Sequence, residues 1–358
     1  MRIAFDVSPL SHERTGVNNY IRGSLRGLAD VAAEHGDEVV AFAPTSPAGR
    51  RAIPEALEGI DVQLKLVTLP FAHFWRTAWS VAARPAAERW LGAFDVLHFS
   101  DWMYPPQRGG VRATTVHDLV PVHHPEWTTR RTRAMHGRKY RNAATTCNVV
   151  FANSAFTADD FARTTGFPRE RVLVAHPGIG LEYGTAGAAV ERDRPYLLTV
   201  ATLEPRKNLG TLVEAFGRLG DTNLTLAVVG GSGWGEQPEL DRPGIVRLGR
   251  VDDEQLARLY RGAAAVVYPS RFEGFGMPIT EAMASGAPVV ASAHASMDEA
   301  AGDAAVRADP ESPDALAAAI REALARRDEL RRLGLEQAAR FSWRRVGEIF
   351  REGYLQFA

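Results

Sequence analysis

The 358-residue sequence contains a single cysteine, Cys147, and no long uninterrupted apolar run. One cysteine excludes internal disulfides and thiolate metal clusters, which fits the reducing cytoplasm, and its apolar surroundings favour a core residue over a nucleophile. A membrane-spanning helix needs about 18 or more apolar residues, so we expect no integral membrane protein. The short apolar start, which reaches Asp6, lacks the length and cleavage site of a signal peptide.

Positive and negative charges are almost balanced, with 42 Lys and Arg against 43 Asp and Glu, so the net charge predicts no nucleic-acid partner. Several cofactor motifs are also missing. No Asp-x-Asp occurs, which removes the usual carboxylate pair for a divalent cation beside a nucleotide diphosphate. The glycine-rich run 230–235 fails the dinucleotide fingerprint at Glu236. We therefore expect neither a metal nor a bound cofactor.

Short, mostly apolar runs alternate with longer segments of helical pattern. Near-continuous apolar runs are typical of strands buried on both faces of a parallel sheet. The expected strands cover 3–7, 39–43, 62–69, 96–99, 113–116, 149–152 and 172–175, and then 196–200, 224–229, 245–248, 265–268 and 289–291. The expected helices cover 20–33, 128–144, 209–219, 253–263, 279–285 and 313–327. This alternation predicts an α/β protein with two doubly wound, Rossmann-like parallel-sheet domains.

The best domain boundary is the stretch between Pro177 and Pro195, which is rich in Gly and small residues. We expect an N-terminal Rossmann-like domain over 1–176, a linker over 177–194 and a C-terminal Rossmann-like domain over 195–340. Residues 341–358 have an amphipathic pattern and are expected to form a terminal helix.

The most informative motif is the stretch 269–288, which follows an expected strand and opens an expected helix. Gly274 and Gly276 allow the backbone to come close to a ligand, and the free amides of a helix start favour a phosphate. Glu273 and Glu281 flank the turn, and carboxylates are good partners for sugar hydroxyls. A plain strand–turn–helix junction would explain any one of these residues alone, but it explains the whole stretch less well.

A second motif places two adjacent cations, Arg206 and Lys207, after the strand 196–200. The carboxyl ends of parallel strands are where α/β folds bind ligands. Cations at a helix start oppose the helix dipole, so an anionic partner such as a diphosphate is favoured over a merely solvated helix end.

A third candidate is His117, at the end of the strand 113–116, where it could bind a sugar hydroxyl and be oriented by Asp118. A structural role is the alternative for a histidine at a strand end. The loop 8–16, which contains Arg14 and ends at Gly16, could cover a phosphate.

Two further segments bear on the acceptor. The helical segment 130–141 contains six Lys and Arg and no acid, and 70–79 contains four Phe and Trp. Together they could contact an anionic membrane surface or a lipid-linked acceptor. The alternative is a solvated basic face beside core aromatics.

These motifs together resemble the family-4 retaining glycosyltransferases of GT-B fold, in which two Rossmann-like domains face each other across a cleft. The resemblance extends over nearly the whole chain, and its most specific part is the E-x7-E spacing from Glu273 to Glu281. Residues 206–208 are similar to the family's diphosphate motif. His117-Asp118, followed by His-Pro-Glu-Trp at 124–127, resembles the bacterial mannosyltransferase-like subgroup.

The resemblance implies a donor site mainly in the C-terminal domain, an acceptor site in the N-terminal domain and a terminal helix that crosses back to the N-terminal domain. It also implies transfer with retention of configuration from a nucleotide-diphosphate sugar. The implied donor-binding residues are Gly16, Arg206, Lys207, Glu273, Gly274, Phe275, Gly276 and Glu281, with Glu299 at the position of a further family acid. The implied catalytic residues are His117, Glu273, Arg206 and Lys207.

The resulting interpretation is a metal-independent hexosyltransferase of polysaccharide or glycoside biosynthesis. GDP-mannose is the preferred donor, with UDP- or dTDP-hexoses as alternatives, and the acceptor is a hydroxyl of a glycan, a lipid-linked molecule or a small molecule. We expect it in the cytoplasm, with peripheral contact at the inner face of the plasma membrane left open. Two other functions are a nucleotide-sugar 2-epimerase of the same fold, which the E-x7-E spacing argues against, and a non-catalytic nucleotide-sugar-binding protein. The latter would be expected to have lost one of the four catalytic residues.

Overall fold

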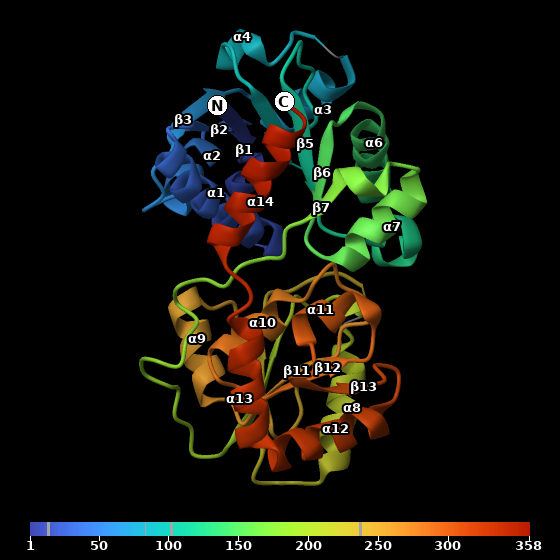
Figure 1. The fold of residues 1–358 in the computed structure, drawn as a ribbon. Coiled ribbons are helices and arrows are strands. Elements are labelled where there is room, and N and C mark those ends of the chain that lie inside the picture. The colour runs from blue at the N-terminus through green and yellow to red at the C-terminus, as the bar shows by residue number, and fades with distance from the viewer. Residues whose placement is uncertain (13–14, 83, 101–102, 236–237) are drawn as a thin grey trace. The chain divides into compact units, whose positions relative to one another are not determined.

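The computed structural model describes residues 1–12, 15–82, 84–100, 103–235 and 238–358. The chain divides into two compact units, of which the first comprises residues 1–178 and 342–358 and the second residues 179–341. Each unit contains one parallel sheet with helices on both faces (Figure 1). This is the fold class that the alternation of strands and helices predicts.

The sheet of the first unit has the strand order β3-β2-β1-β4-β5-β6-β7, and all its pairs are parallel. Its strands are β1 Arg2–Asp6, β2 Glu38–Thr45, β3 Gln63–Thr68, β4 Val96–Phe99, β5 Val111–Val116, β6 Val149–Ala152 and β7 Val172–Val174. The order reverses between β1 and β4, and doubly wound folds bind ligands at the carboxyl ends of the strands beside such a switch point.

Helices cover both faces of this sheet. They are α1 Gly16–His35, α2 Gly49–Ala56, α3 Ala72–Ala82, α4 Glu88–Leu91, α5 Val120–His123, α6 Arg130–Thr146, α7 Ala155–Thr165 and α14 Trp343–Gln356. Side chains of α1 and α14 join the core on one face, and side chains of α6 and α7 join the core on the other. Cys147 is buried in the second of these cores, and burial raises the pKa of its thiol to about 12, in keeping with the expected core role.

The terminal helix α14 lies along α1 (Figure 1). Glycines bring the two backbones together: a Cβ on Gly27 would lie 1.8 Å from the carbonyl oxygen of Trp343, and one on Gly347 would lie 2.2 Å from that of Gly27. The last 17 residues are therefore part of the first unit's core, although the whole second unit precedes them in the chain.

The sheet of the second unit has the order β10-β9-β8-β11-β12-β13, again with parallel pairs throughout. Its strands are β8 Tyr196–Val200, β9 Thr225–Val229, β10 Ile245–Gly249, β11 Ala265–Tyr268, β12 Val289–Ser292 and β13 Ala305–Ala308. Its helices are α8 Leu209–Leu219, α9 Asp253–Gly262, α10 Met277–Ala284, α11 Asp298–Ala301, α12 Pro313–Ala325 and α13 Arg327–Ala338. Here the order reverses between β8 and β11.

The stretch expected to be a linker is packed rather than open. From Ile179 onward it belongs to the second unit, where the amide of Val190 donates to the carbonyl of Arg258 at 2.9 Å. The Arg261 guanidinium donates to the carbonyl of Ala188 at 2.8 Å. Its small residues therefore allow close packing on α9 as well as a change of direction.

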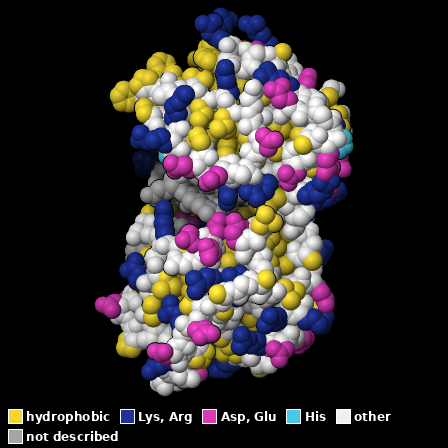
Figure 2. Space-filling view, turned by 90° about the vertical axis from the view of Figure 1, so that its left-hand side faces the viewer, with side chains coloured by type: hydrophobic (Ala, Val, Ile, Leu, Met, Phe, Trp, Pro, Cys, Tyr) yellow, Lys and Arg dark blue, Asp and Glu magenta, His cyan; other side chains and the backbone are white. Residues whose placement is uncertain are grey.

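The length and hydropathy of the helices bear on membrane insertion. In the described part of the chain, none of the helices combines the length and the apolar character needed to cross a bilayer. On the face that Figure 2 displays, acidic and basic side chains are interspersed, in keeping with the net charge of −1.

Candidate functional site

The second unit brings three of the predicted catalytic residues together at its topological switch point. Arg206 and Lys207 lie in a short 3-10 helix, η4 (Pro205–Lys207), that follows β8. Glu273 lies in the turn between β11 and α10. Because β8 and β11 are neighbours, their carboxyl ends place the two cations beside the acid.

The contacts among these residues are direct. A guanidinium nitrogen of Arg206 lies 2.6 Å from Oε2 of Glu273, and Lys207 Nζ lies 2.6 Å from Oε1. Lys207 Nζ also donates to the hydroxyl of Tyr268 at 3.0 Å, and Arg206 pairs with Glu204 at 2.8 Å. One carboxylate thus accepts from two cations with its two oxygens.

Burial and neighbouring charges both shift the pKa values of this cluster. Burial by itself raises the pKa of Glu273, but the nearby charges of Arg206 and Lys207 lower it to about 2. Burial and the charge of Arg206 lower the pKa of Lys207, an effect that Glu273 partly opposes. Any group that takes the place of the Glu273 carboxylate between these cations must therefore be an anion.

Local sequence features hold the two cations in place. Asn208 takes a left-handed conformation (φ 56°) directly after them, and its amide nitrogen donates to the carbonyl of Pro310 at 2.6 Å. The glycine-rich run that failed the dinucleotide fingerprint lies against the segment 201–204. A Cβ on Gly230 would lie 1.8 Å from the carbonyl oxygen of Ala201, and one on Gly233 would lie 2.0 Å from that of Leu203. These glycines support the chain that carries Arg206.

The turn into α10 also has the expected features. Gly276 has a φ of 99°, which side-chain-bearing residues rarely adopt. Glu281, on α10, is buried and accepts a hydrogen bond from the hydroxyl of Tyr260 at 3.3 Å. The side chain of Phe275 packs in the core against Phe341, so only the backbone of Phe275 could contact a sugar donor.

Sequence reasoning missed one residue that contacts this turn, Ser296. The amide of Glu273 donates to Oγ of Ser296 at 3.1 Å, and that oxygen lies 2.8 Å from Nδ1 of His294. Ser296 follows β12, the strand beside β11, and only this neighbourhood singles it out. Glu299 lies on α11, where its backbone carbonyl accepts from the Gln337 amide at 2.8 Å.

In the first unit, His117 follows β5 and packs edge-on against the ring of Tyr20, a residue of α1, with the centroids 4.9 Å apart. Nearby, Asp6 ends β1 and is fully buried, and its carboxylate accepts from Ser8 and Ser100 on either side of the switch point. Burial raises the pKa of Asp6. Asp6 and Ser100 were not predicted as site residues.

A chain of buried polar groups runs beneath His117. Lys139 donates to the carbonyl of Thr115 at 2.6 Å, and the Thr115 hydroxyl lies 3.0 Å from Nε2 of His98. Nδ1 of His98 lies 2.7 Å from the hydroxyl of Tyr354, on α14. Burial, with the charges of Lys139 and His117, holds the pKa of His98 well below its usual value. These contacts fix the end of β5 and hence the start of the His117 loop.

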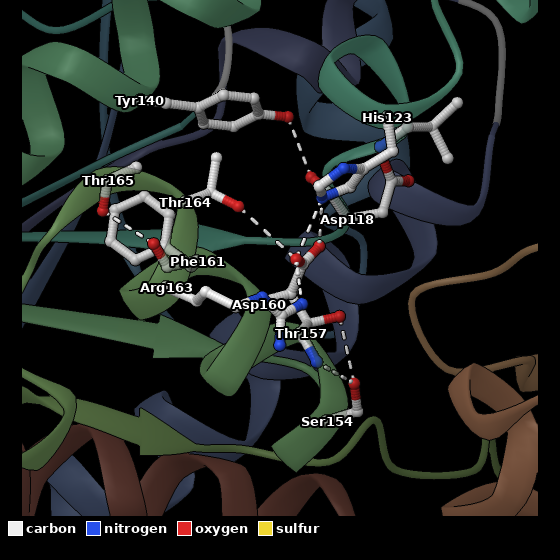
Figure 3. Close-up of polar contacts among 11 residues, drawn as sticks. Asp118, His123, Tyr140, Ser154, Thr157, Asp160, Phe161, Arg163, Thr164 and Thr165 are labelled. Carbon is white, nitrogen blue, oxygen red and sulfur yellow. Dashed lines mark hydrogen bonds and ion pairs between the residues drawn. The ribbon is translucent and has the colours of Figure 1, made fainter.

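Asp118 contributes to this loop in a way that we did not expect. Its carboxylate accepts from the amide of Val120 at 3.0 Å, and its carbonyl accepts from the hydroxyl of Tyr140 at 2.8 Å (Figure 3). Asp118 therefore has a structural role in this loop, and its orientation of His117 stays a prediction. Close by, both oxygens of the buried Asp160 lie 2.9 Å from Nε2 of His123, which ties α5 to α7.

The loop predicted to cover a phosphate contains Arg14 and ends at Gly16. Gly16 is the first residue of α1, directly after Thr15, whose side chain accepts from the amide of Asn18. Arg14 lies outside the described residues. Among the residues that the structure describes, no group of three or more His, Cys, Asp or Glu side chains could hold a metal ion. Metal independence stays a prediction.

Comparisons with known proteins cover nearly the whole chain. The family description "Glycosyltransferase Family 4" matches residues 15–183, and "Glycosyl transferases group 1" matches residues 187–340. The O-antigen chain mannosyltransferase B of Escherichia coli is 29% identical over 376 aligned residues, covering 96% of each chain. The D-inositol 3-phosphate glycosyltransferase of Geodermatophilus obscurus is 35% identical over 224 residues, or 55% of this chain and 50% of that protein. The crystal structure of Anabaena HepE in complex with UDP and glucose matches with a TM-score of 0.72 at 16% identity, covering 98% of both chains.

Proposed function

Because this chain belongs to the family-4 glycosyltransferases of GT-B fold and is a hexosyltransferase that uses a nucleotide sugar, we propose that Arg206 and Lys207 bind the donor diphosphate without a metal ion. The observation that carries the proposal is the convergence of both cations on Glu273 at the β8–β11 switch point. A diphosphate supplies the negative charge that this pair of cations requires.

Binding of the diphosphate frees the Glu273 carboxylate from the two cations. It can then accept hydrogen bonds from the hydroxyls of the donor sugar, beside the backbone amides of residues 274–276. Glu281, eight residues further on and buried on α10, takes the ribose hydroxyls. These roles agree with the position of each residue in the second unit, and each can be tested by substitution.

In the proposed reaction the bond from the sugar to the diphosphate breaks as an acceptor hydroxyl attacks from the same face, so that configuration is retained. The acceptor oxygen forms the new bond to the sugar, and its proton passes to an oxygen of the departing diphosphate. Negative charge develops on the departing diphosphate. Arg206 keeps its contact with Glu204 and Lys207 its contact with Tyr268 when Glu273 is displaced, so both cations stay in position to stabilise that charge. His117 and Gly16 stay predicted contributors from the first unit.

GDP-mannose is the preferred donor within this proposal. Its support is the similarity to a mannosyltransferase over 96% of both chains. UDP- and dTDP-hexoses are the alternatives, and HepE, a protein of similar fold, was crystallised with UDP and glucose. The acceptor is a hydroxyl of a glycan, a lipid-linked molecule or a small molecule.

A thermal-shift panel tests the donor assignment. The purified chain is mixed with GDP-, UDP-, dTDP- and ADP-sugars, each with and without EDTA. We expect one nucleotide class to raise the melting temperature, with no change on adding EDTA, because a ligand that binds only the folded state stabilises it. Loss of the shift with EDTA would contradict the metal-free site, and a shift that survives Arg206→Ala/Lys207→Ala would contradict the diphosphate assignment.

A further inference from the structure

The first unit contains a cavity of about 660 Å³ between α3 and α6. The loops that follow β1 and β2 contribute Ser11, His12 and Ser46 to its wall, which places it at the carboxyl edge of the sheet. Its basic side chains are His12, His73, Arg76, Arg131 and Arg138. Among the described residues, no Asp or Glu lines it.

Burial and the positive charges in this wall lower the pKa values of its two histidines. Burial and the charge of Arg76 lower the pKa of His12, and burial with the charges of Arg131 and Arg76 lowers that of His73. Arg76 is almost fully buried and donates to the carbonyl of Pro44 at 2.7 Å; the acidic group that acts on it is Asp6.

The other two arginines of the cavity, Arg131 and Arg138, lie on α6. Neither forms an ion pair with a carboxylate in the described part of the chain. Two guanidinium groups that line one cavity, with no carboxylate partner among the described residues, favour an anion, and a phosphate or diphosphate suits their planar donor geometry.

The opposite face of α3 lines a groove of a different kind. Its volume is about 330 Å³, and its wall is almost entirely apolar, with three tryptophans: Trp75, Trp79 and Trp90. Phe42 of β2, Val67 of β3 and Leu69, which directly follows β3, complete the apolar floor. One helix therefore separates a cationic cavity from an apolar groove.

Exposed aromatic rings connect the two. Phe71 and Phe74 line the cavity and are 83% and 66% exposed, and Trp75 lines the groove and is 48% exposed. The rings of Phe74 and Trp75 pack edge to face with centroids 5.7 Å apart. These three exposed side chains, of which Phe74 and Trp75 are in ring contact, form an aromatic ridge beside the cationic cavity and the apolar groove, and an exposed apolar surface of this kind marks a binding site.

We propose that this surface binds a lipid-linked acceptor, with its phosphate or diphosphate in the cavity and its apolar chain along the ridge of Phe71, Phe74 and Trp75 into the groove. The proposal rests on the proposed function, since it names the acceptor class of the same enzyme. A soluble sugar phosphate would fill the cavity but leave the ridge and the groove in water, which is why we assign the lipid.

The test uses the full chain and three probes: farnesyl diphosphate, inorganic pyrophosphate and farnesol. Affinity is measured by titration, and hydrogen exchange locates the protected segments. We expect farnesyl diphosphate to bind about tenfold or more tighter than either half-probe, because burial of the chain adds to the charge contacts. Protection should appear in α3 and α6, separate from the donor segments 204–208 and 273–281.

Two double variants sharpen the result. Arg131→Ala/Arg138→Ala should reduce the affinity for farnesyl diphosphate to that for farnesol. Phe74→Ala/Trp75→Ala should reduce it to that for pyrophosphate. The matched control is Arg130→Ala/Arg141→Ala, which removes the same charge from α6 outside the cavity.

The acceptor assignment would be overturned by equal affinity for farnesyl diphosphate and pyrophosphate, by an equal loss in the control variant, or by protection confined to the donor segments. Equal protection of α3 and α6 by phosphatidylglycerol vesicles alone would point to a general membrane surface and would also overturn it. Failure of the donor proposal is seen separately, because Arg131→Ala/Arg138→Ala should keep the thermal shift with nucleotide sugars.

Discussion

Lys207 Nζ and Glu273 Oε1 lie 2.6 Å apart although 66 positions separate the two residues in the chain. Arg206 reaches the other oxygen of the same carboxylate. The contact joins the ends of two neighbouring strands, β8 and β11, and its charges explain both the low pKa of Glu273 and the suitability of this point for a diphosphate.

Lys207→Ala should lower kcat/KM by about 10²- to 10³-fold, because it removes a preorganised positive charge from the departing diphosphate. Steady-state kinetics with the donor found in the thermal-shift panel measures the effect. Lys65→Ala, an exposed lysine on β3, is the matched control and should leave the rate unchanged. A nearly normal rate in Lys207→Ala, with the fold intact by circular dichroism, would remove the diphosphate assignment.

Glu273 should make unfolding dependent on acid pH. Its pKa is about 2 in the folded chain and ordinarily 4.5, so its ionised form stabilises the fold above pH 4.5, and this contribution is lost as the pH falls from 4.5 towards 2. The shift corresponds to about 3 kcal/mol. The free energy of unfolding, measured with urea at several pH values, should therefore change less between pH 4.5 and 2 in Glu273→Gln than in the wild type. Glu336→Gln, on the exposed face of α13, should retain the wild-type slope, and an unchanged slope in Glu273→Gln would contradict the prediction.

His98 should make the stability of the fold depend on pH in a higher range. Because its pKa is lower in the folded chain than the usual 6.5, the unfolded chain binds more protons below pH 6.5, and stability falls as the pH drops. His98→Gln keeps a donor and an acceptor but does not titrate, so its melting temperature should fall less between pH 7.5 and 5.5. His35→Gln, at the exposed end of α1, serves as the control; an equal fall in His98→Gln and the wild type would rule out this role for His98.

Gly27→Ala should destabilise the chain by about 1–3 kcal/mol or more, because the new methyl group has no space between α1 and α14. Gly137→Ala is the matched comparison within another helix, where a Cβ meets nothing within 4 Å. It should stabilise the chain by about 0.5–1 kcal/mol through the lower flexibility of alanine in the unfolded state. Denaturant unfolding measures both, and changes of the same sign would refute the packing argument.

Local patterns were sufficient for most of the fold. The expected strand 196–200 coincides with β8 and 265–268 with β11, because buried parallel strands are short apolar runs whose signal lies within the strand itself. β13 was missed because its four residues include Arg307, which bonds to the carbonyl of Ser292 on the neighbouring strand. α3 was missed as a helix because its many aromatic residues obscure a helical period.

Residue chemistry and motif spacing identified Arg206, Lys207, Glu273 and Glu281 as candidates, since the first three lie between a strand and the next helix and Glu281 lies on the helix α10. Only the tertiary structure disclosed that Ser296 Oγ accepts a hydrogen bond from the Glu273 amide, that Lys139 and His98 hold the end of β5, and that the Asp118 carboxylate accepts from the amide of Val120. The physical reason is range. Strand and helix patterns repeat within a few residues, whereas these contacts depend on the order of strands in a sheet, which decides which distant segments meet.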